Sequence, residues 1–380
     1  MKIMEERKYT IQDLDEYIRQ GEPEKQERGA AWQVAIGLQQ VDGLEPSNYL
    51  LDTARQHIDG DITIGEAKNL IDSYYKSASV NDKVENERTE EADKVSARIT
   101  EIISEKTFSL TPTQLTSIHR RLFEGTFKFA GKIRDYNITK SEWVLKGDTV
   151  YYASCENIKD TLEYDIENER KFSYSGVPVD DAIKHLVRFC ADLWQIHPFG
   201  EGNTRTTAVF IIKYMRTLGL NVVNDTFAKH SWFFRNALVR ANYSNIRAGI
   251  TETTVFLERF FRNMLIGENN RLLNREMHVD WGKLHPNDEI QSANVKSQSA
   301  NNALNLSPKC KICTLEELAV LRVIKENPNA TQKEIASEIH KSERTVKSIT
   351  VSLQEKGIIS RVNGKRNGYW SFENLMFENN

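Results

Sequence analysis

The stretch His197-Pro198-Phe199-Gly200-Glu201-Gly202-Asn203-Thr204-Arg205 decides how this chain is interpreted. It places an imidazole, a carboxylate, glycines, an amide and a guanidinium close together in the sequence. An imidazole suits proton transfer near neutral pH, a carboxylate suits Mg²⁺, and a guanidinium binds phosphate oxygens through its fork of donors. The stretch therefore predicts a site that holds a metal-bound polyphosphate and deprotonates an attacking hydroxyl.

The flanks of this stretch predict two helices joined by a loop. Apolar residues recur at helical spacing from Ile183 to Trp194, and Pro198 prevents that helix from continuing. A second helix is expected from Asn203 onward. A loop that enters a helix presents unpaired backbone N–H groups and the positive end of the helix dipole, which favours a bound phosphate. The alternative, a core helix capped by histidine and followed by a polar loop, does not require this set of residues together.

The arrangement resembles the signature of the Fic family, His-Pro-Phe-x-(Asp/Glu)-Gly-Asn-(Gly/Lys)-Arg-x-x-Arg. Members of that family usually transfer a nucleoside monophosphate to a Ser, Thr or Tyr hydroxyl of a target protein, a reaction called AMPylation when ATP is the donor. The resemblance implies Mg²⁺ as cofactor and ATP as co-substrate. The implied roles are general base for His197, loop anchor for Phe199, Mg²⁺ ligand for Glu201, anion hole for Gly202 and Asn203, and phosphate contact for Arg205.

The chain departs from this signature at two positions. Thr204 stands where the family has Gly or Lys, so we expect added bulk beside the nucleotide. Ala208 stands where the family has a second arginine that contacts the terminal phosphate, and its loss removes a charge-assisted contact of roughly 1.5–3 kcal/mol. Two alternatives follow. The transferred group is a different phosphate-containing one, or the domain is degenerate and senses a nucleotide for a transcriptional regulator.

Residues 134–152 predict a β-hairpin. β-branched and aromatic residues stand on both sides of Gly147-Asp148, a turn signal. The preceding segments, Ile118–Phe123 and Ala130–Arg134, resemble the Fic segment that leads into a substrate flap. The resemblance implies that this flap pairs with an extended piece of the target protein and brings its hydroxyl to His197. A plain surface hairpin is the alternative.

Residues 31–76 predict a small helical module, with helices that begin near Trp32, Asn48 and Ile64. This module resembles the antitoxin-type inhibitory segment of Fic proteins, whose signature is (Ser/Thr)-x-x-x-Glu-(Gly/Asn). The nearest match runs from Leu38 to Gly43, with Asp42 at the Glu position.

The resemblance makes Asp42 and Gly43 regulatory candidates. In the family the glutamate pairs with the second arginine, which is Ala208 here. An unpartnered buried charge is costly, so the two departures fit each other. We expect the module to inhibit weakly or through Arg205. A plain helical hairpin with a glycine C-cap is the alternative.

Residues 314–380 predict a winged helix-turn-helix. Three helical patterns are followed by two short apolar runs around Asn363-Gly364, a hairpin turn signal. The pattern resembles winged-helix DNA-binding domains, which implies a third helix that faces DNA. The candidates for DNA contact are Arg344 and Lys347 on that helix and Lys365 and Arg366 on the wing. A solvated charged face or a protein-docking module is the alternative.

Composition limits the remaining classes. The chain has 380 residues, 39% of them hydrophobic, and a formal net charge of −3, which favours a globular protein without an overall basic field. No apolar run is long enough to cross a membrane and no signal peptide is visible at the N-terminus, so we expect cytoplasmic residence and no membrane partner. Cys310 and Cys313 lack a second pair at zinc-site spacing, so we expect free thiols.

We therefore predict a mainly α fold, in which a Fic-type helical bundle carries a β-hairpin flap and a small winged-helix domain follows. The Asn-, Ser- and Gln-rich stretch before the last domain reads as a linker. The expected boundaries are a charged lead-in over 1–30, the helical module over 31–76, the Fic core over 77–270, the linker over 271–313 and the winged helix over 314–380.

Overall fold

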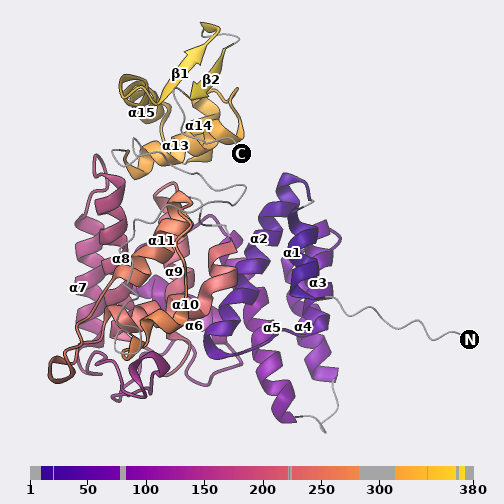
Figure 1. The fold of residues 1–380 in the computed structure, drawn as a ribbon. Coiled ribbons are helices and arrows are strands. Elements are labelled where there is room, and N and C mark those ends of the chain that lie inside the picture. Colours follow the sequence, from indigo (N-terminus) through magenta and orange to yellow (C-terminus); the bar gives the residue numbers. More distant parts are fainter. Residues whose placement is uncertain are drawn as a thin grey trace, which may run out of the picture.

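A computed structural model describes residues 10–19, 21–77, 83–220, 222, 225–281, 313–339, 341–364 and 368–372. These residues form a mainly helical fold with a two-stranded sheet near the C-terminus (Figure 1). The N-terminal helices lie on one side of a central helical bundle, and the sheet belongs to a small domain at one end of it. No helix within these ranges is long and apolar enough to span a membrane.

The N-terminal module is built around Trp32, whose buried indole Nε1 donates to Nδ1 of His57 at 3.0 Å. Ser47 caps one of its helices by accepting from the N–H of Leu50, and Gly60 ends that helix in the left-handed conformation. The elements are α1 (Ile11–Arg19), α2 (Pro23–Gly37), the 3-10 turn η1 (Leu38–Asp42), α3 (Asn48–Asp59) and α4 (Ile64–Ser77), and the long helix α5 (Lys83–Ser104) packs against them.

The predicted lead-in over residues 1–30 needs correction. Residue 30 falls inside α2, and α1 buries Leu14 and Ile18 in the core of the module. These two residues stand one helical turn apart, so one apolar stripe of α1 is covered. The described part of the lead-in therefore belongs to the N-terminal module.

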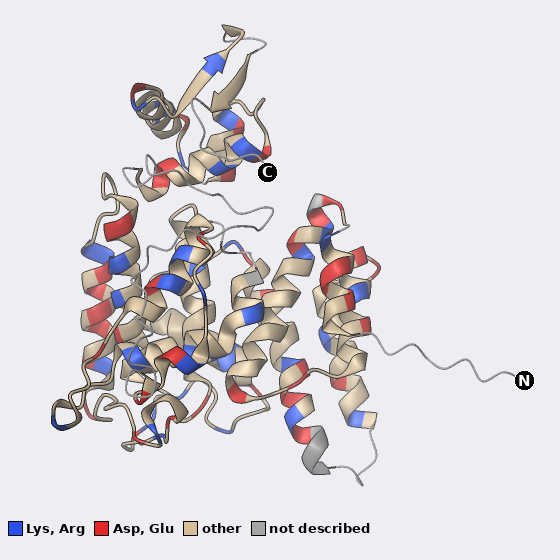
Figure 2. Cartoon of the chain, viewed as in Figure 1, with Lys and Arg blue, Asp and Glu red and all other residues tan. Residues whose placement is uncertain are grey.

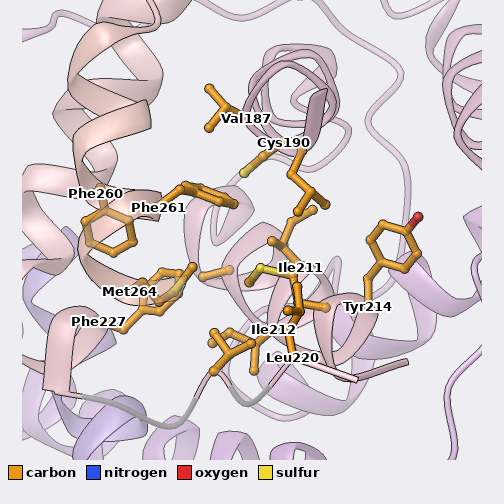
Figure 3. Packing of buried hydrophobic residues seen from close by; sticks show 14 of the residues in the cluster. Val187, Cys190, Ile211, Ile212, Tyr214, Leu220, Phe227, Phe260, Phe261 and Met264 are labelled. Atoms are coloured by element: carbon orange, nitrogen blue, oxygen red, sulfur yellow. The ribbon is translucent and has the colours of Figure 1, made fainter. Parts of the chain in front are cut away.

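The central bundle surrounds α9 (Asn203–Thr217), in which every residue from Asn203 to Met215 is buried. A helix buried on all sides needs apolar neighbours on all sides. Figure 3 shows them: Val187 and Cys190 lie on one side of Ile211, and Phe260 and Phe261 lie across from it. The surrounding helices are α6 (Pro112–Phe123), α7 (Ile158–Lys171), α8 (Val179–Ile196), α10 (Asp225–Ala241) and α11 (Val255–Ile266). Acidic and basic residues are interspersed along the helices, as along α7 (Figure 2).

Residues 134–152, the flap loop, double back on themselves without strands. The N–H of Glu142 donates to the carbonyl of Asp148 at 2.9 Å, and Gly147 takes a positive φ of 90°. A 3-10 turn, η3 (Trp143–Leu145), stands where the hairpin end was expected. The predicted turn is confirmed, and the predicted strands are wrong. The cause is burial of Val144, whose carbonyl accepts from Val279, so the backbone bonds to the bundle instead of across a ladder.

Part of the predicted linker also packs on the bundle. The short turn η4 (Ile246–Ala248) precedes α11. After α11 the chain forms η5 (Asn274–Met277), in which Met277 is fully buried. Residues 282–312, which include Cys310, lie outside the described residues. Cys155 and Cys190 have free thiols.

The C-terminal domain has the predicted order of three helices and a wing. Its helices are α13 (Leu315–Glu326), α14 (Gln332–Glu338) and α15 (Glu343–Glu355), and its strands β1 (Ile359–Val362) and β2 (Tyr369–Phe372) pair antiparallel. Capping boxes at Thr314 and Thr331 fix the starts of the first two helices. The N–H of Val179 donates to the carbonyl of Cys313 at 2.8 Å, so the domain begins against α8.

Candidate active site

His197 occupies the C-cap of α8 in a left-handed conformation, with φ 50° and ψ 57°. This conformation is strained for a residue other than glycine, and it turns the chain sharply into the loop of residues 197–205. The ring is 2% exposed. It contacts the rings of Tyr152, with centroids 4.1 Å apart, and Trp194, with centroids 5.2 Å apart.

The hydrogen bond of the His197 ring determines which nitrogen is available. Nδ1 lies 3.3 Å from the carbonyl oxygen of Trp194, and a carbonyl only accepts, so Nδ1 carries the hydrogen. Nε2 is buried and has no hydrogen-bond partner among the described residues. Burial, and then the nearby ammonium of Lys140, hold the pKa of His197 well below its usual value. The neutral ring thus offers the Nε2 lone pair, the form that a general base requires.

Asn203 closes the loop on itself. Its Oδ1 accepts from the N–H of Phe199 at 2.9 Å, and its Nδ2 donates to the carbonyl of Phe199 at 2.8 Å. Phe199 is buried, which agrees with its expected role as anchor. The Asn203 side chain therefore holds the loop, and what this position offers an anion is the backbone N–H at the start of α9, which has no partner within the helix.

Gly202 precedes α9 with φ 77°, and only glycine fits there. A Cβ at this position would lie 2.4 Å from Cε2 of Phe123 on α6. The close approach of α6 to the loop therefore depends on the missing side chain.

His119 supports the same loop from α6. Its Nε2 donates to the carbonyl of Glu201 at 3.0 Å, its Nδ1 accepts from the N–H of Gly131 at 2.8 Å, and its ring stacks on Phe199. Burial lowers the pKa of His119 to about 4, so the ring is neutral and both bonds hold at neutral pH. His119 lies within the segment Ile118–Phe123, which resembles the Fic family, but no local signal in the sequence pointed to this contact with the loop.

Arg134 joins the flap loop to the 197–205 loop. Its guanidinium is buried and donates to the carbonyls of His197 at 2.8 Å, Tyr136 at 2.6 Å and Ala153 at 2.6 Å. Its own N–H donates to the carbonyl of Pro198 at 2.9 Å. One side chain thus fixes the backbone of the proposed base relative to the flap loop.

Glu201 and Thr204 point in different directions. The carboxylate of Glu201 is 56% exposed and lies 2.8 Å from Nζ of Lys140 on the flap loop. The hydroxyl of Thr204 accepts from Nε1 of Trp194 at 3.0 Å and is buried, so this hydroxyl faces the bundle. Ala208 is fully buried on α9.

Arg205 is 2% exposed and is held by the N-terminal module and α5. Its Nη2 donates to Oε1 of Glu91 at 2.6 Å, and its Nη1 donates to Oε1 of Gln39 at 3.0 Å. Its Nε makes a charge contact with Oδ2 of Asp42 at 2.8 Å, at an angle outside hydrogen-bond geometry. The structure thus brings Asp42 to Arg205, and it adds Gln39 and Glu91, for which the sequence carried no local signal.

Gly43 and Arg88 fix the segment that carries Asp42. Gly43 ends η1 in the left-handed conformation, and the Nη2 of Arg88 donates to the carbonyls of Asp42 and Gly43 at 3.0 and 3.1 Å. Arg88 and Glu91 stand on one face of α5. The contact with Arg205 is therefore built from η1 and α5 together.

A cleft of about 630 Å³ opens between η1, α5 and the bundle. Its volume is in the usual range for small-molecule sites. The lining residues are Gln40, Val41, Asp42, Gly43, Leu44, Arg88, Glu91, Phe127, Glu201, Arg205, Trp232 and Arg235. Predicted metal, phosphate and regulatory residues thus share one cleft.

The donor set fits Mg²⁺ delivered with a nucleotide. The described residues contain no cluster of three or more His, Cys, Asp or Glu side chains that could hold a metal by themselves. Mg²⁺ commonly takes one or two protein carboxylates and completes its shell with substrate phosphates and water. Glu201, with its accessible carboxylate at the start of α9, matches that mode.

The candidate DNA-contacting residues belong to the C-terminal domain. Arg344 and Lys347 are exposed and stand three residues apart on α15, so they share a face of that helix. Lys365 and Arg366 lie outside the described residues.

Comparison with known proteins agrees with both domains. The Fic/DOC family matches residues 109–215, and a family described as winged helix-turn-helix DNA-binding matches residues 317–360. The protein adenylyltransferase VbhT of Bartonella schoenbuchensis is 26% identical over 212 residues, which cover 54% of this chain. The chain spans 41% of the length of that relative. The crystal structure of a Fic family protein from Desulfovibrio desulfuricans aligns over 98% of this chain and 99% of its own, with 11% identity and a TM-score of 0.39.

The residues that close the 197–205 loop lie inside the first matched region, and α15 lies inside the second. The chain therefore carries a Fic/DOC family domain over residues 109–215, followed by a winged helix-turn-helix over residues 317–360.

Proposed function

We propose that this protein transfers a nucleoside monophosphate from Mg²⁺-bound ATP to a Ser, Thr or Tyr hydroxyl of a target protein. The observation that carries the proposal is the His197 ring. Its hydrogen is fixed on Nδ1, and its Nε2 lone pair is buried beside the loop that bears Glu201 and Arg205. The similarity to an adenylyltransferase supports the same reaction class.

In this reaction the target hydroxyl attacks the α-phosphate, its proton passes to Nε2 of His197, and the bond from the α-phosphate to the leaving pyrophosphate breaks. The first N–H groups of α9 bind the phosphate oxygens, and Gly202 allows their close approach. Glu201 would hold Mg²⁺, which would offset phosphate charge. Arg134 fixes the backbone of the base relative to the flap loop, because it donates to the carbonyl of His197 itself.

The N-terminal module restrains this site. Arg205 is the arginine of the loop, and its guanidinium faces the carboxylates of Asp42 and Glu91 instead of a phosphate. Nucleotide binding has to compete with these carboxylates for the same donors. We infer inhibition through Arg205, made by η1 and α5 together.

The winged helix provides a second binding site, for DNA. Exposed Arg344 and Lys347 on the third helix support DNA binding by that helix. A nucleotide donor and DNA would both be met in the cytoplasm, where we place the protein. The second candidate function is a regulator that senses a nucleotide and controls a promoter, and the buried Ala208 favours it because the terminal phosphate loses a cationic contact.

The test uses purified protein with Mg²⁺ and ATP labelled at either the α- or the γ-phosphate, with and without cell lysate, beside His197→Ala. Protein labelled from the α-position only, and unlabelled in the variant, supports nucleotidyl transfer. Label from the γ-position means phosphorylation. Nucleotide binding without label from either position favours the sensing regulator.

A further inference from the structure

Lys140 extends from the flap loop to Glu201, one of the residues that line the cleft of the candidate active site. Its backbone N–H donates to Oγ1 of Thr149 at 3.1 Å, which ties the two arms of the loop at that point. Its Nζ lies 2.8 Å from Oε2 of Glu201, and the two side chains are 26% and 56% exposed. The ammonium is also close enough to His197 to lower the pKa of that ring.

Two cations that line the cleft are held by carboxylates of the chain, whereas a third, Arg88, donates to the carbonyls of Asp42 and Gly43. Arg205 faces Asp42 and Glu91. Arg235 makes two hydrogen bonds to Glu142, at 2.7 and 3.1 Å, and the Glu142 side chain is 1% exposed. These pairs are buried or half-buried, so exchanging their partners requires desolvated charges to separate.

Lys140 differs because its partner, Glu201, is the carboxylate that the proposed function assigns to Mg²⁺. When Glu201 binds Mg²⁺, the ammonium of Lys140 loses its counter-ion. It then lies beside the phosphates of the nucleotide that carries the metal. A lysine side chain is long and rotates its three donors freely, so it reaches a phosphate oxygen without movement of the flap backbone.

We propose that Lys140 is a nucleotide phosphate-binding residue, and that the flap thereby supplies a positive charge that α9 lacks at Ala208. This inference rests on the proposed function. It assigns to the flap loop a contact with the donor nucleotide in addition to the docking of a target.

The experiment measures the Kd of ATP and of adenosine for the full chain by equilibrium binding in the presence of Mg²⁺. Lys140→Met is compared with Lys140→Arg and with the control Lys146→Met. Lys146 lies on the same flap loop but pairs with Asp280. Removal of one charge-assisted contact is expected to raise the Kd of ATP about tenfold in Lys140→Met. The Arg variant restores part of the affinity, and the control and the adenosine affinity stay at wild-type values.

Three results would overturn this inference alone. Unchanged ATP affinity in Lys140→Met means that the ammonium does not contact phosphate. Tighter ATP binding means that Lys140 only shields Glu201 from the metal. An equal loss for adenosine and ATP means that the variant disturbs the flap. Failure of ATP to bind to both the wild-type protein and Glu91→Gln, in which Arg205 is less restrained, removes the proposed function and this inference together.

Discussion

Nη2 of Arg205 on α9 donates to Oε1 of Glu91 on α5 at 2.6 Å, although the two residues are 114 positions apart in the sequence. This bond links the Fic loop to a helix that precedes the matched Fic region. With Asp42 beside Nε of the same guanidinium, Arg205 is paired with two carboxylates of the chain. In the proposed function, a nucleotide has to compete with these carboxylates for Arg205.

Glu91→Gln and Asp42→Gly are each expected to strengthen ATP binding. Each removes a carboxylate that competes with phosphate for Arg205, and we expect the Kd of ATP to fall about three- to tenfold by calorimetry. Glu90→Gln is the matched control, because Glu90 pairs with Lys94 on the same helix. Unchanged affinity in both variants would eliminate the inhibitory role of the module.

Arg134→Met is expected to destabilise the protein by about 3 kcal/mol or more in urea unfolding, since it leaves buried carbonyls at His197, Tyr136 and Ala153 without their donor. Lys132→Met, two residues away, serves as the exposed-surface comparison. Equal unfolding midpoints for the two variants would show that Arg134 does not hold the loops together.

Gly202→Ala is expected to abolish transfer and lower stability by about 2 kcal/mol or more, because a Cβ meets the Phe123 ring and φ is positive. Gly176→Ala is the control, since that glycine also has a positive φ but nothing within 4 Å of its Cβ position. If both variants lose the same stability and Gly202→Ala retains activity, the close approach of Phe123 is not essential.

Acidification is expected to destabilise the bundle through His119. The folded-state pKa is about 4 against 6.5 for the free side chain, so the unfolded chain binds more protons between these values. The free energy of unfolding therefore falls as pH drops from 6.5 toward 4, by up to about 3 kcal/mol. Urea unfolding at stepped pH should show a shallower dependence for His119→Gln, and parallel curves for the two proteins would contradict the assignment.

Arg344→Ala and Lys347→Ala are expected to weaken DNA binding by the full chain. A lost phosphate contact lowers the slope of log K against log salt by about 1 and affects all sequences alike, whereas a lost base contact costs about 1–3 kcal/mol at one position of the site. Mobility shifts over a salt series measure both. Absence of any shift at low salt with operator-length duplexes would favour a protein-docking role.

The sequence predicted the fold where signals are local. Pro198 follows the end of α8, and α9 begins at Asn203 after Gly202, each as expected. These features depend on backbone groups within a few residues, so neighbouring side chains determine them. The candidate functional residues were predicted in the same way, because the 197–205 loop places their chemical groups within one short segment.

Tertiary structure decided what those residues contact. It turned the Thr204 hydroxyl to Trp194, placed Glu91 and Gln39 on Arg205, and replaced the expected flap strands by a loop whose Val144 is buried in the bundle. None of these contacts has a local signature, because each depends on which buried groups need a partner once distant helices have packed. The sequence by itself determined the elements and the chemical groups of this protein, and packing determined which of those groups face the cleft and which are held by the chain.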